Sequence, residues 1–420
     1  MDMHVFEQAT QDILTVLPQS SADFARLREL ARTNASPTVT VIGKYNHGKS
    51  RLLNELIGED IFTVADRRET IALAEHQHQQ VRWLDAPGLD ADVFGQDDHL
   101  AHEALWTQSD IRLFIHSVRE GELDSAEHPL IQQLHQDQQR SQRQTLLVLT
   151  QIDQIADPNV LADILASIAK QVPSTPLFPV SATRHRQAIA GNKQVLLKKS
   201  GIIELKEALT TALNHVPQAR LHEKKQIITE TQSLLQQLKQ QHHQDLAQLQ
   251  QLQITQRQAF EQDLNKVLDK IQNDLQPLLQ ISGTDEALVP DSFENMFKMT
   301  AGKQERARIQ VAYSRACIDI NSHLIRYGVV GLPSHQQTNV RSLDTVMVAV
   351  MGVSVKFRDD LKKIFCSTSG RERLQREFSH YFELSADREA LKQNITALNK
   401  LLALDEKAHI ALQHLELELC

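Results

Sequence analysis

Two hydrophobic patterns divide this chain. Between residues 39 and 180, short apolar runs alternate with segments of helical periodicity, a pattern typical of an α/β domain with a mostly parallel sheet. After Pro217, apolar residues recur at intervals of three and four among many glutamines, which predicts long helices. Two further segments with helical spacing, 5–16 and 22–31, precede the first apolar run. We therefore expect N-terminal helices, then an α/β domain, then an all-α region.

The individual elements follow from the same patterns. Strands are expected at 39–43, 71–75, 81–84, 111–118, 146–149 and 177–180, and helices at 104–110 and 129–138. Later expected features are breaks at 282–284 and 289–291, a helix at 305–324, a loop at 328–339 and a final helix pair at 386–403 and 405–419. Polar tracts near 240–244 and 250–258 interrupt the leucine pattern, which favours an extended stalk or coiled coil over a compact bundle.

The length of 420 residues exceeds what one hydrophobic core usually serves, so more than one domain is expected. We assign 1–36 to helices that pack on the helical region, 37–215 to the α/β domain and 216–420 to a helical stalk or bundle. The final helix pair would then return to the N-terminal helices.

A complete phosphate-binding motif follows the first apolar run. Residues Gly43–Ser50 match G-x-x-x-x-G-K-[ST], with a strand before the motif and a helix after it. Backbone N–H groups of such a loop cradle phosphates, Lys49 reaches the β- and γ-phosphates, and Ser50 binds Mg²⁺. The alternative is a glycine-rich turn that only connects a strand to a helix. The full Lys49-Ser50 ending favours the phosphate site.

A mobile threonine is expected to complete the Mg²⁺ shell. Phosphate-loop hydrolases carry this threonine about 20 residues beyond the loop serine, and Thr70 has that spacing. The alternatives are Thr63 or a plain solvent loop. Arg67 and Arg68 just before Thr70 are candidates for an internal arginine finger, or else a solvated pair or a partner contact.

An Asp-x-Pro-Gly segment forms the second part of the site. Asp85 follows a buried strand and is placed to hold Mg²⁺ through water, while the backbone N–H of Gly88 would point at the γ-phosphate. The next position, where small signalling GTPases carry a water-orienting glutamine, is Leu89. A leucine cannot orient water, so hydrolysis must use another group.

The ends of two later strands supply a candidate base site. Thr150-Gln151-Ile152-Asp153 resembles the N-K-x-D or T-K-x-D segment in which the aspartate accepts hydrogen bonds from guanine. Asp153 fits that role, but Gln151 replaces the lysine that covers the base, so guanine over adenine stays open. Ser181-Ala182-Thr183 would contact the guanine oxygen through its backbone. The residues expected to contact the nucleotide are Gly43, Lys44, Tyr45, Asn46, His47, Gly48, Lys49, Ser50, Arg51, Asp85, Thr150, Gln151, Asp153, Ser181, Ala182 and Thr183.

With these motifs, residues 39–215 resemble a GTPase domain of the translation-factor-related class, and most closely that of bacterial dynamin-like proteins. Gly-Lys-Tyr-Asn-His-Gly-Lys-Ser, Asp-Ala-Pro-Gly, Thr-Gln-Ile-Asp, Leu89 and the flanking helices carry the resemblance. The resemblance implies GTP hydrolysis stimulated by dimerisation of the GTPase domain, and membrane association through the tip of a helical stalk. Asn46 also stands where cation-activated GTPases carry an asparagine that holds K⁺ beside the phosphates; the alternative is an amide that stabilises the loop.

Composition limits the partners. A formal charge of −8 disfavours broad nucleic-acid binding, and three scattered cysteines suit a reducing compartment without a disulfide framework. The N-terminus lacks the pattern of a secretory signal and no run could span a bilayer, so we expect a cytoplasmic protein that can lie on the inner face of a membrane. The apolar run 343–355, followed by basic residues, is a candidate for membrane contact, core or a partner interface. His76 with His78 and His99 with His102 lack the spacing of a metal site.

The sequence thus predicts a GTPase with Mg²⁺ as cofactor, K⁺ as an additional candidate ion, and a catalytic set of Lys49, Ser50, Thr70 and Gly88. GTP and GDP are the expected ligands, and a homodimer or higher assembly is the expected protein partner. The alternatives are a ribosome- or RNA-associated assembly GTPase and a nucleotide-binding coiled-coil scaffold with little or no hydrolysis.

Overall fold

The computed structural model describes residues 2–32, 35–62, 73–86, 102–173, 175–290, 292–295, 297–337, 339, 345–352 and 355–419. Contacts divide the chain into two compact units. Unit 1 comprises Met1–Leu238 and Leu404–Cys420, and unit 2 comprises Lys239–Ala403. The helices α9 (Ile202–Leu279) and α14 (Ala386–Leu419) contribute residues to both units. The expected fold class, an α/β domain with a mostly parallel sheet plus a large helical region, is confirmed.

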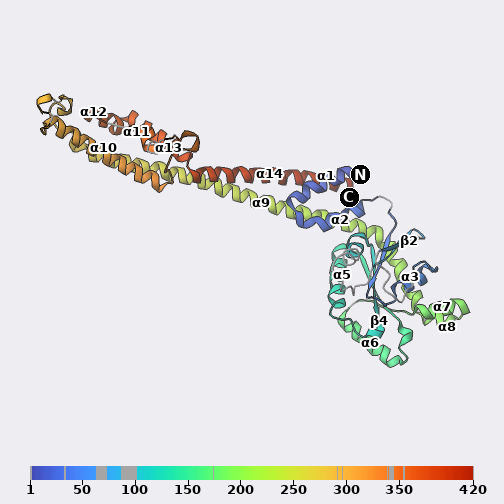
Figure 1. Ribbon diagram of the computed structural model, residues 1–420. Helices are drawn as coiled ribbons and strands as arrows, with labels where there is room; N and C mark the ends of the chain where they lie inside the picture. Colours follow the sequence, from blue (N-terminus) through green and yellow to red (C-terminus); the bar gives the residue numbers. More distant parts are fainter. Residues whose placement is uncertain are drawn as a thin grey trace. The chain divides into compact units, whose positions relative to one another are not determined.

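Unit 1 contains the sheet (Figure 1). In the described part of the chain its strands are β1 (Thr38–Gly43), β2 (Ala74–His78), β3 (Val81–Asp85), β4 (Ile111–Ser117), β5 (Gln144–Thr150) and β6 (Leu177–Pro179). Their spatial order is β2-β3-β1-β4-β5-β6, and only β2, at the edge, runs antiparallel to its neighbour. β1 is central, so the loop that follows it lies between the carboxyl ends of β3 and β4.

Helices cover both faces of the sheet. On one face, Leu52 of α3 (Lys49–Ile57) and Leu205 of α9 pack in one core with residues of β1 and β4. On the other face, Ile131 of α5 (Glu127–Ser141) and Ile168 of α6 (Pro158–Gln171) pack with Phe114 of β4. Figure 1 shows α5 and α3 on opposite sides of the strands. Two short helices, α7 (Ala182–Gly191) and α8 (Gln194–Lys198), follow β6.

The two N-terminal helices, α1 (Met3–Val16) and α2 (Ser21–Ala31), share a separate core with both long helices. Phe6 and Phe24 are buried there with Ile228 of α9 and with Ala408 and Leu412 of α14. The chain ends therefore meet within unit 1.

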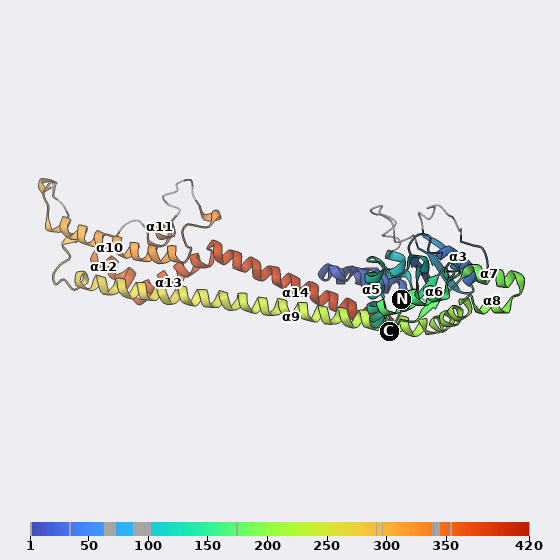
Figure 2. The ribbon, with the colours of Figure 1, turned by 90° about the horizontal axis from the view of Figure 1, so that it is seen from below.

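Unit 2 is built on the C-terminal half of α9 (Figure 2). Its other helices are α10 (Ala301–Arg326), α11 (Val346–Met351), α12 (Arg358–Leu361) and α13 (Thr368–Glu383). Phe260 of α9 stacks on Phe382 of α13, with ring centroids 4.4 Å apart and an interplanar angle of 6°. Offset stacking of this kind adds to the area buried, so the ring pair joins α9 to α13.

Three expectations about the helices differ from the structure. The final helix pair is one helix, α14, because residues 386–419 contain no glycine or proline that would end it. The helix expected at 104–110 is a π-helical turn at Glu103–Gln108. Pro217, after which we expected the helical region, lies within α9, which begins at Ile202.

The apolar run 343–355 belongs to the core where the structure describes it. Val346, Val350, Met351 and Val355 are buried in the core of unit 2. This supports the core interpretation over lipid contact for those side chains. Over the described residues, the helices are each too short or too polar to cross a membrane.

A buried histidine in unit 2 provides a test of this packing. His323 of α10 lies 4.8 Å from Phe260 between ring centroids, and its Nε2 has no hydrogen-bond partner among the described residues. Burial lowers the pKa of His323 to about 4. In the unfolded chain His323 takes up a proton as the pH falls below its ordinary pKa of 6.5, whereas in the folded protein it stays neutral down to about pH 4. The free energy of unfolding therefore decreases as the pH falls from about 6.5 to about 4.

We therefore expect His323→Phe to remove part of the acid sensitivity of the protein. When the pH is lowered from 7 to 4.5, the free energy of unfolding of the wild type should fall by on the order of 2 kcal/mol more than that of the variant. Urea unfolding at the two pH values measures this difference. His335→Phe, at an exposed position, is the matched control and should leave the pH dependence unchanged. An identical pH dependence in His323→Phe and the wild type would contradict the assignment.

Candidate nucleotide-binding site

The loop after β1 is held close to its neighbouring strand. A Cβ atom at Gly43 would lie 2.2 Å from the Ile115 carbonyl oxygen of β4, so only glycine fits there. Gly48 has a φ of 81°, in the left-handed region that glycine tolerates best, and caps the N-terminus of α3. The first N–H groups of α3 therefore face the loop, the arrangement that binds phosphate in other proteins.

The side chain of Lys49 curls over this loop. Its Nζ donates to the carbonyl oxygens of Gly43 and Lys44, both at 2.9 Å. The ammonium group is thereby kept beside the loop backbone, where phosphate oxygens would lie in a site of this kind.

Ser50 and Asp85 form the metal-binding part of the site. Ser50 Oγ donates to Asp85 Oδ2 at 2.5 Å, and Asp85 Oδ1 is buried without a hydrogen-bond partner in the described structure. Burial raises the pKa of Asp85, against the opposing effects of the Ser50 hydrogen bond and the Lys49 charge. A hydroxyl and a carboxylate with an unsatisfied oxygen are hard ligands of the type Mg²⁺ prefers. The residues present therefore fit Mg²⁺.

The end of β5 is fastened to the phosphate loop. Thr150 Oγ1 donates to the carbonyl oxygen of His47 at 2.6 Å, and Gln151 Nε2 donates to that of Asn46 at 2.7 Å. Gln151 Oε1 also accepts from Ser117 Oγ at 2.8 Å. Gln151, which stands where the base-recognition segment carries a lysine, thus connects the loop to β4 and β5. Sequence reasoning missed this because it depends on Asn46 having a φ of 60°, a local conformation that the motif does not specify.

The candidate base-recognition residues lie together. Ser181 Oγ donates to Asp153 Oδ1 at 2.6 Å and accepts from the N–H of Arg184, which caps α7. Ala182 and Thr183 form the first turn of α7 and are half-buried. The structure therefore brings Asp153 together with the Ser181–Thr183 segment, at the same end of the sheet as the phosphate loop.

Several predicted site residues lie outside the described residues. They are Thr63, Arg67, Arg68, Thr70, Gly88 and Leu89.

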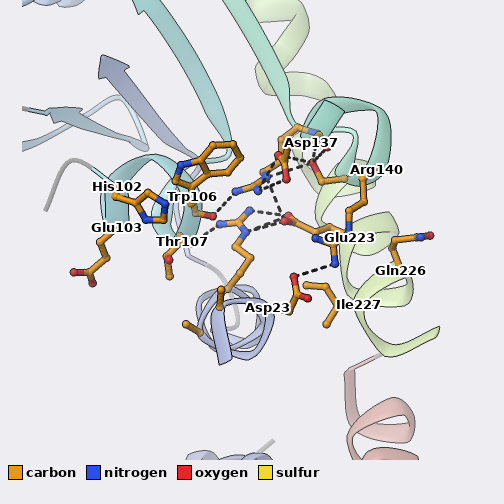
Figure 3. A pocket seen from close by; sticks show the side chains of 15 residues that line it. Asp23, His102, Glu103, Trp106, Thr107, Asp137, Arg140, Glu223, Gln226 and Ile227 are labelled. Carbon is orange, nitrogen blue, oxygen red and sulfur yellow. Dashed lines mark hydrogen bonds and ion pairs between the residues drawn. The ribbon is translucent and has the colours of Figure 1, made fainter. Parts of the chain in front are cut away.

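A cavity of about 560 Å³ lies in unit 1 beside α2, the turn Glu103–Gln108, α5 and α9 (Figure 3). Arg26 of α2 is buried in its wall and pairs with Glu223 of α9 at 2.9 Å and with Asp110 at 3.0 Å. Arg143 also reaches Glu223, at 3.2 Å. Sequence analysis missed this network because its members are 84 and 197 positions from Arg26 and match no motif.

A second group missed by sequence analysis lies behind the phosphate loop. His47, His116 and Glu127 are buried together, with one possible ligand atom from each within 4.8 Å of the others. Its only sequence signal was a histidine inside the loop motif and another in a buried strand.

Part of the chain is similar to known GTPases. Residues 38–151 match the family described as a 50S ribosome-binding GTPase. GTPase Era of Bordetella petrii is 28% identical over 156 residues, which is 36% of this chain and about half (51%) of Era. The solved structure of an oligomerised bacterial dynamin pair aligns over 97% of this chain and 77% of its own, with 13% identity and a TM-score of 0.35.

One relative matches over the whole chain. An uncharacterized protein of Acinetobacter baylyi is 56% identical over 416 residues, 99% of each chain. This chain therefore belongs to the same family as that Acinetobacter protein, and it carries a phosphate-loop GTPase domain.

Proposed function

We propose that this protein binds and hydrolyses GTP and couples its nucleotide state to self-assembly or membrane association, as a dynamin-like protein does. One observation carries the proposal: the same helix, α9, supplies core residues both to the GTPase sheet and to the helical unit. A helix that contributes to both cores is a candidate route for coupling the nucleotide state to the helical unit. The domain limits we propose are 1–36, 37–215 and 216–420, the last boundary falling inside α9.

The chemistry rests on the residues of the phosphate loop. Lys49 would neutralise charge developing on the γ-phosphate, and the loop N–H groups would hold the phosphates in line for attack by water. Ser50 and Asp85 would hold Mg²⁺, which supplies charge neutralisation across the β- and γ-phosphates when bound. Thr70 and the N–H of Gly88 are proposed to complete the site.

Asp153 and Ser181 support guanine as the base. Their 2.6 Å hydrogen bond orients the Asp153 carboxylate, which would accept hydrogen bonds from guanine N1 and its amine. Ala182 and Thr183 would contact the guanine oxygen through their backbone. Tyr45, Arg51 and the remaining loop residues would line the phosphates.

Water activation needs a group other than residue 89, because leucine has no polar atom. We propose that dimerisation of the GTPase domain, or K⁺ held by Asn46, completes the transition-state contacts. Both contributions make hydrolysis depend on conditions that can be varied in solution.

The loop between α9 and α10 is the surface we propose for membrane contact. Phe293 is 87% exposed, Phe297 97% and Met299 72%, with Lys298 between them. Large apolar side chains beside a basic residue suit the interface of an anionic bilayer. This loop replaces the run 343–355, in which Val346, Val350, Met351 and Val355 are buried, as the membrane candidate.

The second candidate function is ribosome-associated assembly. The family description for residues 38–151 and the resemblance to Era favour it. The Era match covers 36% of this chain, and the net charge of −8 gives no general attraction to RNA. A scaffold that binds nucleotide with little hydrolysis is the third candidate, favoured by Leu89 and Gln151.

Turnover tests the catalytic proposal. GTP hydrolysis per molecule should rise with protein concentration, and should be faster in K⁺ than in Na⁺. Lys49→Ala should abolish nucleotide binding, and Asn46→Ala should remove any preference for K⁺. Absence of hydrolysis in every ionic condition and at every concentration would favour the scaffold instead.

Gln151 should contribute to affinity through the loop. Gln151→Ala loses the hydrogen bonds to Asn46 and Ser117, so affinity for GTP and GDP should fall roughly five- to tenfold. Gln151→Lys keeps a donor for the Asn46 carbonyl and should retain most of the affinity for GTP and GDP. Gln154→Ala, at an exposed position three residues on, is the matched control. Fluorescent-nucleotide titration reports the affinities, and an unchanged Kd in Gln151→Ala would count against the role.

Flotation separates the membrane and ribosome candidates. The protein should float with anionic vesicles, and the double variant Phe293→Ala and Phe297→Ala should not. Ile318→Ala with Val311→Ala, two exposed positions on α10, should float like the wild type. Failure of the wild type to float, together with co-sedimentation with ribosomes, would favour the second candidate.

A further inference from the structure

Two histidines and two glutamates meet behind the phosphate loop, where the GTPase chemistry makes no use of them. The side chains of His47, His116 and Glu127 are each at most 1% exposed, whereas Glu120 lies at the rim. The two imidazole rings are 5.4 Å apart between centroids and nearly perpendicular. The four residues come from the loop, from β4, from the turn after β4 and from the first position of α5.

Both rings are surrounded by acceptors. His116 Nδ1 lies 3.0 Å from each Glu127 carboxylate oxygen, and its Nε2 lies 3.0 Å from the Gly121 carbonyl oxygen. A neutral imidazole has a single N–H, so it can satisfy one of these two neighbours and leaves the other facing a lone pair.

The surroundings of His47 repeat the pattern. Its Nε2 lies 2.9 Å from Glu120 Oε1, and its Nδ1 lies 3.2 Å from the Ile115 carbonyl oxygen and 3.7 Å from Glu127 Oε1. Three of the four ring nitrogens therefore lie in hydrogen-bond geometry with acceptors, and His47 Nε2 lies close to the Glu120 carboxylate without a hydrogen bond to it. Two imidazoles and a buried carboxylate thus converge behind the loop, with one buried ring nitrogen left unsatisfied among the described residues.

We propose that this cluster is a binding site for a divalent transition metal of the zinc class, with His47 Nδ1, His116 Nδ1 and Glu127 as ligands. Two imidazoles and one carboxylate are a ligand set that such ions use. Tetrahedral ligands at about 2.0 Å from a metal lie roughly 3.3 Å apart. The ligand atoms here lie within 4.8 Å of one another, so a contraction of at most about 1.5 Å would close the site.

The outer contacts favour the metal. Histidines that bind metal through one nitrogen usually donate from the other to a carboxylate or a backbone carbonyl. With metal on the two Nδ1 atoms, His116 Nε2–H keeps the Gly121 carbonyl as its acceptor. His47 Nε2 lies 2.9 Å from Glu120 Oε1 without hydrogen-bond geometry, and a small turn of the ring would let it donate to that carboxylate. The contacts exchanged for metal bonds are those of His47 Nδ1 with the Ile115 carbonyl and of His116 Nδ1 with the Glu127 carboxylate.

Metal at this position would act on the phosphate loop. His47 lies between Asn46 and Gly48, and its carbonyl already accepts a hydrogen bond from Thr150. A bond from its ring to a metal shared with β4 and α5 would fix the loop from behind. The ion is thus a structural regulator of the loop, separate from the Mg²⁺ of Ser50 and Asp85.

Cobalt titration of the full-length chain tests the site. The protein is stripped with a chelator and titrated with Co²⁺ without nucleotide, so that the result is independent of GTP binding. Wild type should bind one equivalent with the visible absorption of tetrahedral Co²⁺, and Zn²⁺ should displace it. His116→Gln and Glu127→Gln should bind at least tenfold more weakly. His128→Gln, the next position on α5, is the matched control and should bind normally.

Further variants separate a ligand from a buried hydrogen-bonding group. His116→Cys replaces the imidazole by another metal ligand and should restore Co²⁺ binding with a thiolate charge-transfer band, which a merely structural role would not produce. Far-ultraviolet circular dichroism of each variant checks that it is folded. Folded wild type that binds no Co²⁺ would overturn the proposal. Binding lost in Asp85→Asn but kept in His116→Gln would overturn it in favour of the Mg²⁺ position.

Discussion

The buried carboxylate of Asp110 is the constraint on which the arrangement of unit 1 depends. It accepts hydrogen bonds from the N–H of Thr38, where β1 begins, and from the guanidinium groups of Arg26 on α2 and Arg220 on α9. Burial alone would raise the pKa of Asp110, but Arg220 and Arg26 outweigh it and the net shift is downward. Glu223 closes the network by pairing with Arg26. Removing one partner of a buried pair leaves an uncompensated charge and costs about 3–5 kcal/mol.

This network has a consequence for coupling. The N-terminal helices and α9 are attached to the start of β1, the strand whose other end carries the phosphate loop. The turn Glu103–Gln108 also reaches the network, because the carbonyl of Thr107 accepts from Arg26 at 3.0 Å. A displacement of that turn would therefore change a contact of Arg26. Because buried ion networks tolerate few alternative arrangements, such a displacement would move α2 and α9 relative to the sheet instead of being absorbed locally.

The parts of the structure that sequence could predict are those encoded locally. Gly43–Ser50, the strand before it and the helix after it follow from a motif and its flanking periodicity, and so does the position of Asp85 at the end of β3. The contacts of Arg26 and of His116 could not be predicted, because they depend on which elements the sheet order brings together. The continuity of α14 was missed for a different reason: spacing alone gives no stop signal, and only the absence of glycine and proline over 386–419 indicates one helix.

The two apolar segments of the helical unit show where periodicity stops being informative. The run 343–355 is the more hydrophobic in sequence, yet four of its large apolar side chains are buried in one core with residues of α9, α10 and α13. Phe293 and Phe297 lie in a stretch of mixed polarity but are almost fully exposed. Burying a phenylalanine side chain is worth about 2 kcal/mol, so leaving two of them in water forgoes roughly 4 kcal/mol that a lipid surface could recover. The exposure of a side chain in the folded protein therefore decides which segment is available to a membrane, and hydropathy values do not report that exposure.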